Sequence, residues 1–480
     1  METKNPYQKH MESKGKNDCP RILFAGTASG AGKTTITCAF MRSMQKEKVK
    51  ISAFKCGPDY IDPMFHREVL GVESGNLDCF FQEKEQMQES LRRHTTDADL
   101  AMIEGVMGYY DGIGFGTEAS TAQVAALTDT PVILVVDCKG RALSALAEVY
   151  GFVHYRPEGR QIKGVLCNRL PQYLWPAAEQ QIREMGLVPV GYLPEHKEFT
   201  LKSRHLGLVT PGEIDGFQEQ LDHLADLFVQ TVMARTILDI AKEAKDFSAE
   251  TDNNIKTIEE VELRVPEKEK IRIALAQDEA FCFYYRENTE ILQKLGCEIV
   301  PFSPLRDEKL PDCDGLILPG GYPELYAENL EKNKLVQKEI CDRIENGLPT
   351  IAECGGYLYL HERLTNAEGE SFRECGLIPA ACVYKGFQRQ FGYIELTAQK
   401  DQLLAEAGDT LKAHEFHYFV SEQTGDAFLA EKPDRSRNWM AAIATDTLYA
   451  GFPHIAFSGS PKAAMRFAEA ARQYHIKKSI

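Results

Sequence analysis

The sequence predicts an α/β protein of two domains, each built on a parallel sheet. The chain has 480 residues, more than one hydrophobic core ordinarily serves. From Arg21 onward, short apolar runs alternate with helical patterns, which is typical of parallel strands covered by helices on both faces. A charged segment, residues 242–270, interrupts this alternation and is the expected linker. We therefore expect a disordered arm over residues 1–19 and domains at 20–241 and 271–480.

Each expected strand is a short apolar run that ends at a glycine, a proline or a polar residue. The first run is followed by a helix expected from about Lys33 to Gln45. The runs of the first domain are RILFAG, KVKISAFKCG, LAMIEGV, TPVILVVD, IKGVLCNRL and LVPVGYLP. Those of the second domain are KIRIALAQD, CDGLILPGG and LPTIAECGG.

Composition excludes several classes of partner. A net charge of −16 argues against general affinity for nucleic acid or an anionic membrane. The thirteen cysteines are scattered without a C-x-x-C pair, which favours a reducing, cytoplasmic location over a disulfide scaffold or a zinc site. The N-terminus has no apolar signal segment, and no apolar stretch is long enough to span a bilayer.

The stretch GTASGAGKTT, residues 26–35, is typical of a phosphate-binding loop between a strand and a helix. Its backbone N–H groups would face the phosphates, the lysine would neutralise them, and Thr34 would reach Mg²⁺. The alternative is a glycine-rich turn with a chance lysine. The residues expected to bind ATP are Gly26, Gly30, Gly32, Lys33, Thr34 and Thr35. The G-x5-G-K-T spacing resembles that of dethiobiotin synthetase, an ATP-dependent enzyme that activates a carboxylate-type group.

Carboxylates that could hold Mg²⁺ follow the strands of the first domain. Asp59 and Glu104 are the expected ligands with Thr34, and Asp137 is a third acid at a strand end. Acids at the carboxyl edge of a parallel sheet line its ligand crevice. Each acid taken alone could equally be a polar residue that ends its strand.

A second candidate site lies in IAECGGYLYL, where a strand ends at Glu353 and Cys354 occupies the turn before a helix. This is the pattern of a nucleophile elbow with sulfur in place of a hydroxyl. We expect the helix N-terminus to lower the pKa of the thiol. The N–H groups of Gly355 and of Gly321, within the Gly320–Gly321 pair, would form an oxyanion hole. The alternative is a buried structural cysteine.

The thiol needs a base, and several histidines follow it in the sequence. His454 is the preferred base because it follows a short strand-like run and precedes a final helix, and His417 is the alternative. His414 and His417, three residues apart, could also bind a metal, although no further ligand cluster supports this. His361 and His475 are less favoured, since one ends the helix after the elbow and the other lies in the charged tail.

Taken together, the motifs resemble the cobyrinic acid a,c-diamide synthase family, the glutamine-dependent ligases of corrin biosynthesis. The resemblance covers about residues 20–470 and rests on an ordered series of motifs. The chain departs from the family near its C-terminus, where Phe452 and Ala456 replace a tyrosine and a second histidine, so His454 lacks an acid two residues later. The motifs are GTASGAGKTT, FKCGPDYIDPMFH, NLDCF, IEGVMGYYDG, CNRL, SRHLGL, LILPGGYPE, AECGGYLYL, QFGYIEL and HEFHYF.

The resemblance implies a dethiobiotin-synthetase-like P-loop ligase domain followed by a class I glutamine amidotransferase domain. ATP and Mg²⁺ would activate a substrate carboxylate as an acyl phosphate, and ammonia released from glutamine by Cys354 would convert it to an amide. The partners would be glutamine, ATP and a corrinoid polycarboxylate, and a homodimer is compatible with the sequence. The residues expected to hold the carboxylate arms are Lys55, Arg204, His205, Lys385 and Arg389.

Three other interpretations remain. The same chemistry could act on hydrogenobyrinic acid or nickel sirohydrochlorin, which the sequence does not distinguish from cobyrinic acid. A P-loop switch ATPase would account for the first domain but not for the ECGG elbow. A Cys–His hydrolase with a vestigial nucleotide domain would hydrolyse glutamine without using ATP.

Overall fold

The computed structural model divides the chain into two compact units, Met1–Thr251 and Asp252–Ile480. The division falls inside the segment expected to be a linker. The described residues are 18–195, 211–247, 270–386 and 390–479, with side chains described only from 218 onward in the helix that begins at 211.

The first unit is built on a seven-stranded sheet of order β3-β2-β4-β1-β5-β6-β7. All six strand pairs are parallel, so every carboxyl end lies at one edge of the sheet. Register places Glu104 beside both Phe24 and Lys55, which brings three separate sequence motifs to this edge. The strands are β1 Arg21–Gly26, β2 Ile51–Cys56, β3 Ser74–Leu77, β4 Leu100–Glu104, β5 Val132–Asp137, β6 Ile162–Asn168 and β7 Val188–Leu193.

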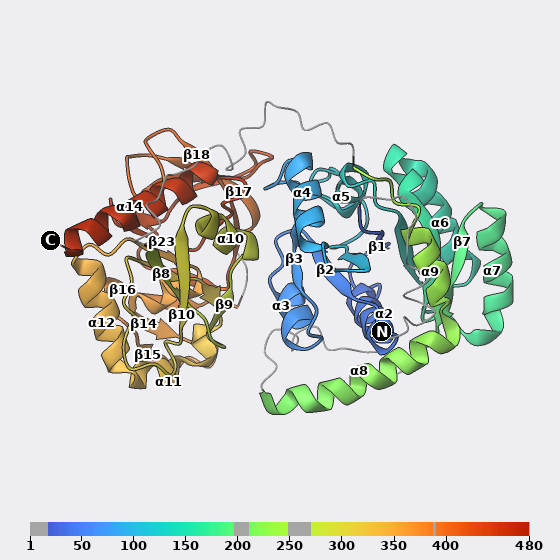
Figure 1. The fold of residues 1–480 in the computed structure, drawn as a ribbon, viewed down its shortest axis with the longest axis horizontal. Coiled ribbons are helices and arrows are strands. Elements are labelled where there is room, and N and C mark those ends of the chain that lie inside the picture. The colour runs from blue at the N-terminus through green and yellow to red at the C-terminus, as the bar shows by residue number, and fades with distance from the viewer. Residues whose placement is uncertain (1–17, 196–210, 248–269, 387–389, 480) are drawn as a thin grey trace. The chain divides into compact units, whose positions relative to one another are not determined.

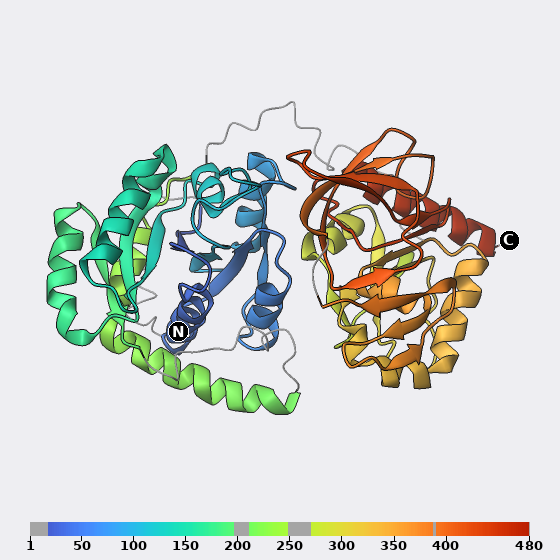
Figure 2. The ribbon, with the colours of Figure 1, turned by 180° about the vertical axis from the view of Figure 1, so that it is seen from behind.

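Helices cover both faces of this sheet, as Figures 1 and 2 show from opposite sides. The central strand β1 explains why two layers are needed: Ile22 and Phe24 enter one apolar core, while Leu23 and Ala25 enter the other. The helices are α2 Lys33–Lys46, α3 Ile61–Glu68, α4 Lys84–His94, α5 Thr121–Leu127, α6 Leu143–Tyr155, α7 Trp175–Glu184, α8 Pro211–Thr231 and α9 Ala234–Ala241, with short 3-10 turns at Pro157–Gln161 and Gln172–Leu174.

The second unit contains a six-stranded sheet of order β10-β8-β11-β13-β23-β22, parallel except for the β22–β23 pair. The strand β13 lies inside this sheet, so its carboxyl end at Glu353 opens onto the edge where a parallel sheet binds ligands. The strands are β8 Ile271–Ala276, β10 Cys297–Phe302, β11 Gly315–Leu318, β13 Thr350–Glu353, β22 Ile443–Ala444 and β23 Leu448–Gly451.

Three further sheets complete the second unit, and their strands were not predicted from the sequence. All their strand pairs are antiparallel except β14–β16. Two of them bring site residues to the parallel sheet: β12 pairs with β9, and β24 pairs with β18 so that His454 lies opposite His414. The order of the larger two is β15-β14-β16-β19 and β21-β20-β17-β18-β24. Their strands are β9 Phe281–Phe283, β12 Gly320–Gly321, β14 His361–Thr365, β15 Ser371–Arg373, β16 Ile378–Tyr384, β17 Phe391–Ala398, β18 Thr410–Phe416, β19 Phe419–Ser421, β20 Phe428–Glu431, β21 Asn438–Ala441 and β24 His454–Ile455.

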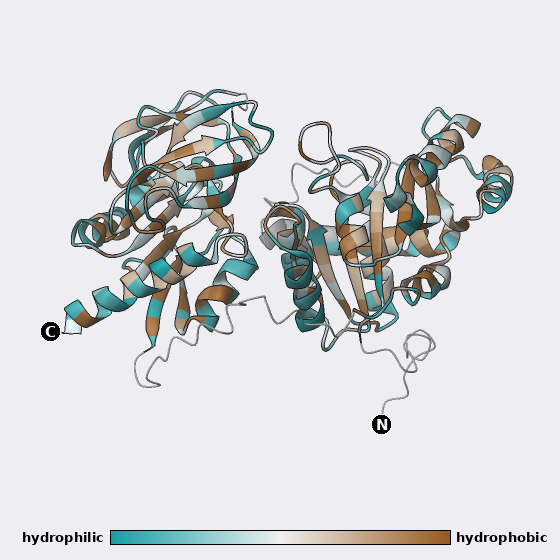
Figure 3. Cartoon of the chain, turned by 90° about the horizontal axis from the view of Figure 1, so that it is seen from above, coloured by the Kyte–Doolittle hydropathy of each residue, from teal (hydrophilic) through white to brown (hydrophobic). Residues whose placement is uncertain are grey.

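The helices of the second unit pack their apolar sides on the sheets and leave polar sides outward, as the hydropathy colouring in Figure 3 shows. Among the described residues, no helix combines the length and the apolar character needed to cross a membrane. The helices are α10 Arg286–Lys294, α11 Ala327–Lys332, α12 Lys334–Glu345, α13 Gly355–Tyr359 and α14 Pro461–Ser479, with a 3-10 turn at Pro323–Leu325.

Candidate active sites

The loop between β1 and α2 is shaped by glycines at positions that admit no side chain. Gly32 has φ 99°, and a Cβ there would lie 2.2 Å from the Asn168 amide nitrogen. A Cβ on Gly26 would lie 3.1 Å from Nζ of Lys33. The glycines thus let the backbone approach a ligand closely, as the phosphate-loop prediction requires.

Lys33 opens α2 and is buried. Its Nζ donates to the carbonyl oxygens of Met107, at 2.5 Å, and Ala28, at 3.3 Å. Burial lowers the pKa of Lys33 to about 8, and the neighbouring Lys55 ammonium adds to this effect. An ammonium in these surroundings would gain from an anionic ligand, because an adjacent negative charge favours its protonated form.

Glu104 ends β4, is 0% exposed and lies at the centre of a buried hydrogen-bond network. Its Oε1 accepts from the Thr34 hydroxyl at 2.7 Å and lies 2.9 Å from Nζ of Lys55, while Oε2 accepts from the Thr37 hydroxyl at 2.8 Å. Nε2 of His66 lies 3.4 Å from Oε2. Burial raises the pKa of Glu104, but the Lys55 charge and the His66 contact outweigh burial and hold that pKa well below its ordinary value.

Two acids of the motif around α3 have different surroundings. Asp62 lies 2.5 Å from Nζ of Lys55, inside the Glu104 network, and its pKa is raised well above the ordinary value by burial and by the Glu104 charge. Oδ1 of Asp59 accepts the backbone N–H groups of Ile61 and Asp62, at 2.9 and 3.2 Å, at the start of α3, and the Asp59 charge raises the pKa of Lys55 and of Asp62, so its role as a metal ligand stays a prediction. Sequence reasoning missed Asp62, although Asp62 and His66 lie four residues apart on one face of this helix.

Asp137, the third strand-end acid, is also engaged elsewhere. Its Oδ2 lies 2.6 Å from Nη2 of Arg169, whose guanidinium also donates to the Gly30 carbonyl oxygen at 3.3 Å. The Asp137–Arg169 pair therefore contacts the phosphate loop through Arg169 and is separate from the Glu104 network.

The residues predicted to bind a polycarboxylate are only partly described. Lys55 is 3% exposed and lies in the Glu104 network, so it is available to a ligand of the phosphate site and not to the outer surface. Lys385 is exposed just after β16. Arg204, His205 and Arg389 lie outside the described residues, and their role stays a prediction.

Cys354 occupies a tight turn between β13 and α13, with φ 46° and ψ −99°. Such a conformation is strained for a residue with a Cβ, and it is typical of a strand-to-helix turn that presents a nucleophile. The Cys354 N–H donates to the Gly451 carbonyl oxygen at 2.8 Å, which fixes the turn to β23. A Cβ on Gly355 would lie 2.9 Å from the backbone nitrogen of Gly321, and the Gly355 N–H is directed at the thiol. The two predicted oxyanion-hole residues therefore lie together beside the sulfur.

The expected lowering of the thiol pKa is wrong. Burial raises the pKa of Cys354 well above its ordinary value, and the carboxylates of Glu324, Glu415 and Glu353 raise it further. The helix α13 has only five residues, so its dipole is too small to oppose these effects. The resting thiol is protonated, and its activation depends on a base.

His454 lies on β24 at 2% exposure, next to this turn. Its Nδ1 lies 3.6 Å from Oε2 of Glu353, whose Oε1 accepts the Ile455 N–H at 2.9 Å. A Cβ on Gly320 would lie 2.4 Å from Cε1 of the imidazole, so the ring packs on the strand that carries Gly321. The predicted base and the predicted oxyanion hole thus converge on the turn that carries the thiol.

The other two histidines considered as ligands or bases have different partners. Nδ1 of His417 lies 2.6 Å from the Phe419 carbonyl oxygen and Nε2 lies 2.8 Å from Oε1 of Glu415, so both nitrogens are engaged. Its ring stacks on Phe452 at 3.7 Å. Burial and the nearby His454 lower the pKa of His414 to about 3, which keeps it neutral. The described part of the chain holds no group of three or more side chains arranged to bind a metal.

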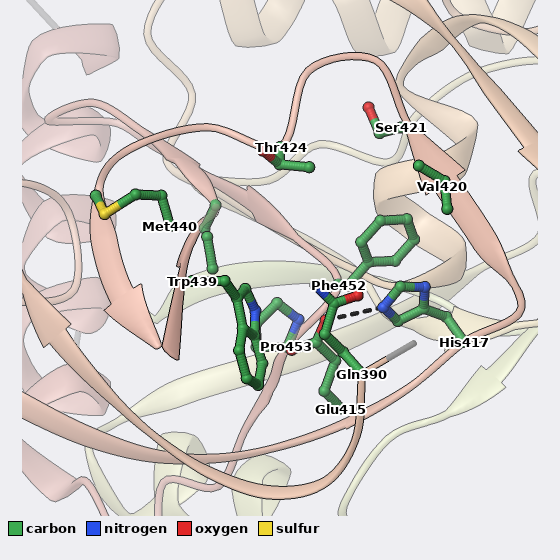
Figure 4. Close-up of a pocket in the computed structure, with 12 residues that line it drawn as sticks. Gln390, Glu415, His417, Val420, Ser421, Thr424, Trp439, Met440, Phe452 and Pro453 are labelled. Atoms are coloured by element: carbon green, nitrogen blue, oxygen red, sulfur yellow. Dashed lines mark hydrogen bonds and ion pairs between the residues drawn. The ribbon is translucent and has the colours of Figure 1, made fainter. Parts of the chain in front are cut away.

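A cavity of about 140 Å³ lies beside the His417–Glu415 pair (Figure 4). Oε2 of Glu415 and Nε1 of Trp439 are buried and have no hydrogen-bond partner among the described residues, and both residues line the cavity. Glu415 is followed by Phe416, whose carbonyl oxygen lies 3.8 Å from the Cys354 sulfur. The lining residues are Gln390, Glu415, His417, Val420, Ser421, Thr424, Trp439, Met440, Ala441, Ala442, Phe452 and Pro453.

Comparison with known proteins matches both units to described families. The CobQ/CobB/MinD/ParA nucleotide binding domain matches residues 22–281, and the CobB/CobQ-like glutamine amidotransferase domain matches residues 272–461. The cobyrinate a,c-diamide synthase of Caldanaerobacter subterraneus is 33% identical and covers 96% of this chain and 100% of its own length. That of Listeria innocua is 36% identical, covering 94% and 100%, and that of Fusobacterium nucleatum is 37% identical, covering 92% and 98%. The chain therefore belongs to the cobyrinate a,c-diamide synthase family of glutamine-dependent ligases.

Proposed function

We propose that this chain converts the a and c side-chain carboxylates of cobyrinic acid to amides, using ATP and ammonia released from glutamine. The proposal rests on two features that occur together on one chain. One is a phosphate loop in contact with a carboxylate at a strand end. The other is a turn that carries a thiol and lies beside an imidazole. Full-length relatives named cobyrinate a,c-diamide synthase support the choice of substrate.

In the ligase step, Lys33 would neutralise the β- and γ-phosphates of ATP. The Thr34 hydroxyl and the Glu104 carboxylate present hard oxygen atoms 2.7 Å apart at the loop, a donor set that fits Mg²⁺ shared with phosphates. Mg²⁺ bound there would offset the phosphate charge. A substrate carboxylate would attack the γ-phosphate to give an acyl phosphate, and ammonia would then displace phosphate.

In the glutaminase step, the Cys354 sulfur would attack the side-chain amide of glutamine while His454 takes the thiol proton. The N–H groups of Gly355 and Gly321 would stabilise the negative oxygen that forms. A base is essential because burial and nearby carboxylates hold the thiol pKa high. The cavity beside Glu415 would hold the ammonium and carboxylate of glutamine, with Oε2 of Glu415 accepting and Nε1 of Trp439 donating.

The proposal also includes Arg204, His205, Lys385 and Arg389 as partners of the anionic arms of the corrinoid. It places the enzyme in the cytoplasm, and it includes assembly as a homodimer.

Mass spectrometry tests the proposal. Cobyrinic acid is incubated with the protein and Mg-ATP, with either glutamine or ammonium as nitrogen source, and two successive small mass decreases that require ATP are expected with both. Amidation with ammonium alone would contradict the glutaminase assignment. No mass change with either source would contradict the substrate, and hydrogenobyrinic acid and nickel sirohydrochlorin would be compared next.

A further inference from the structure

We propose that Glu353 is the positioning residue of His454, replacing an acid that other class I amidotransferases place two residues after the base. The inference rests on the proposed glutaminase function. In this chain the position two residues after His454 is Ala456, which has no carboxylate. The acid therefore has to come from another part of the fold, and it comes from the residue directly before the nucleophile.

The contacts of Glu353 are those of a fixed acceptor. Its Oε1 accepts the backbone N–H of Ile455 at 2.9 Å, which ties the carboxylate to the strand that carries His454. Its Oε2 lies 3.6 Å from Nδ1 of His454, close enough for charge attraction and for a hydrogen bond after a small adjustment. The main chain of Glu353 pairs with Gly451 of β23, so the acid is held by two strands.

This placement assigns the two nitrogens of the imidazole. With Nδ1–H directed at Glu353, Nε2 keeps its lone pair and can act as the base. Nε2 lies on the side of Gly320, where a Cβ would be 3.3 Å away, and Gly320 precedes the predicted oxyanion residue Gly321. The base nitrogen thus faces the strand beside the thiol turn, while the other nitrogen faces the acid.

The titratable groups around His454 come from four elements. They are Glu353 at the end of β13, the Cys354 thiol after it, His414 opposite on β18, and the Tyr449 hydroxyl of β23, which donates to the Pro453 carbonyl oxygen. Burial keeps His414 neutral, and burial keeps the Tyr449 hydroxyl protonated. In the described part of the chain, Glu353 is therefore the acid that forms an ion-pair contact with His454.

The proton balance follows from this assignment. The thiol proton moves to Nε2 as the S–C bond forms, giving an imidazolium whose Nδ1–H is held by the Glu353 carboxylate. The imidazolium returns the proton from Nε2 to the departing nitrogen as the C–N bond breaks. Ammonia leaves and the thioester remains, and no proton passes to Glu353 in these steps.

The test compares Glu353→Gln with Glu353→Asp in the full-length protein. Glutamine keeps the size of the side chain and the oxygen that accepts from Ile455, but it removes the charge. We expect Glu353→Gln to lower kcat of glutamine hydrolysis about 10²-fold, with little change in KM, and to move the acid limb of the pH profile to lower pH because the imidazolium loses its stabilising charge. Glu353→Asp should recover part of the rate and the original acid limb.

The matched control is Glu374→Gln, which makes the same change at a buried carboxylate of the same unit, 6% exposed. Burial raises the pKa of Glu374 well above its ordinary value, so that side chain is already neutral and glutamine should leave activity unchanged. Ammonium-dependent amidation should be retained by all three variants.

Two results would overturn the inference. One is a Glu353→Gln enzyme with the rate and pH profile of Glu374→Gln. The other is an equal loss of ammonium-dependent amidation, which would make the residue structural. Failure of the proposed function itself would look different: wild-type protein would release no more ammonia from glutamine than Cys354→Ala does.

Discussion

Glu104 and Glu353 occupy equivalent places in the two units. Each ends an internal strand of its sheet and each is buried. Glu104 lies beside the loop that follows the neighbouring strand β1, whereas Glu353 directly precedes the turn at Cys354. Their partners differ: Glu104 contacts the Lys55 ammonium and two threonine hydroxyls, whereas Glu353 contacts an imidazole and a backbone N–H. The carboxyl edge of a parallel sheet therefore supplies a buried acid in both cases, and the partner decides what the acid can do.

The physical distinction is between a permanent charge and a temporary one. The Lys55 charge keeps Glu104 ionised despite complete burial, so a hard oxygen ligand is always present at the phosphate loop. In the proposed glutaminase step, His454 takes up the thiol proton, so the charge attraction of Glu353 would strengthen at that moment.

The largest effect is expected for Cys354→Ala, which should remove glutamine-dependent activity and leave ammonium-dependent activity intact. Glutamine-dependent amidation should fall by about 10³-fold or more, because the nucleophile is gone. Amidation with ammonium should stay within about twofold, since the Glu104 network is untouched. Mass spectrometry measures the amidation rate with each nitrogen source. Loss of amidation with glutamine and with ammonium alike would show that the two sites do not work independently.

Glu104→Gln tests the acid of the first unit and should impair the ligase activity. Amidation with either nitrogen source should fall by about 10²-fold or more, because a neutral amide replaces the charged ligand at the phosphate loop. Removing one partner of a buried ion pair should also lower the free energy of unfolding of the first unit by about 3 kcal/mol. Mass spectrometry of the amidated product measures the first effect, and urea unfolding monitored by fluorescence measures the second. ATP-free glutamine hydrolysis is the control and should be retained. A Glu104→Gln enzyme with normal ligase activity would contradict the assignment.

Gly32→Ala tests whether the backbone geometry of the phosphate loop is needed for ATP binding. A Cβ would lie 2.2 Å from the Asn168 amide at φ 99°, so we expect a loss of about 1–3 kcal/mol in unfolding free energy and about a tenfold higher KM for ATP. Gly71→Ala is the control, since Gly71 has φ 63° but a Cβ there would have no neighbouring atom within 4 Å. The control should lower the free energy of unfolding through backbone strain but leave the KM for ATP unchanged. Equal KM values for the two variants would contradict the proposed loop geometry.

The smallest effect is a pH dependence of ATP binding. The pKa of Lys33 is lowered to about 8, so its ammonium is lost as pH rises through that value, and ATP affinity should fall progressively above it. The sign for folding is opposite: the unfolded chain binds more protons between about pH 8 and the ordinary lysine pKa, so stability rises with pH in that window. Calorimetric ATP titrations from about pH 7 to about pH 9 measure the first effect. Lys33→Arg keeps its charge and should flatten the dependence, and an unchanged slope in that variant would exclude Lys33 as its origin.

Much of the fold could be predicted because its signals are local. Most parallel strands are continuous apolar runs, and the two loops carry short motifs between a strand and a helix. The parallel strand β3, with the sequence SGNL, is not such a run and was missed. The smaller sheets of the second unit were missed too, since strands such as β18 mix apolar and polar residues and pair through distant segments. Among the site residues, the turn at Cys354 and the loop at Lys33 lie where the motifs place them.

The unpredicted features all depend on contacts between distant residues. Glu353 and His454 are separated by about a hundred positions and meet only because β13 pairs with β23. The thiol pKa depends on burial and on three carboxylates from separate elements, of which only Glu353 belongs to the elbow motif. Asp62 could have been found from its helical spacing to His66, but its contact with Lys55 requires the sheet register.

The protonated state of Cys354 also bears on how the enzyme withstands oxidants. Peroxides and alkylating metabolites attack thiolates, and a thiol held protonated within a tightly packed turn reacts slowly with them. If Cys354 is the nucleophile proposed above, its protonated form would be slow to form sulfenic acid between turnovers. The sulfur would react readily with oxidants only while its proton is on the base.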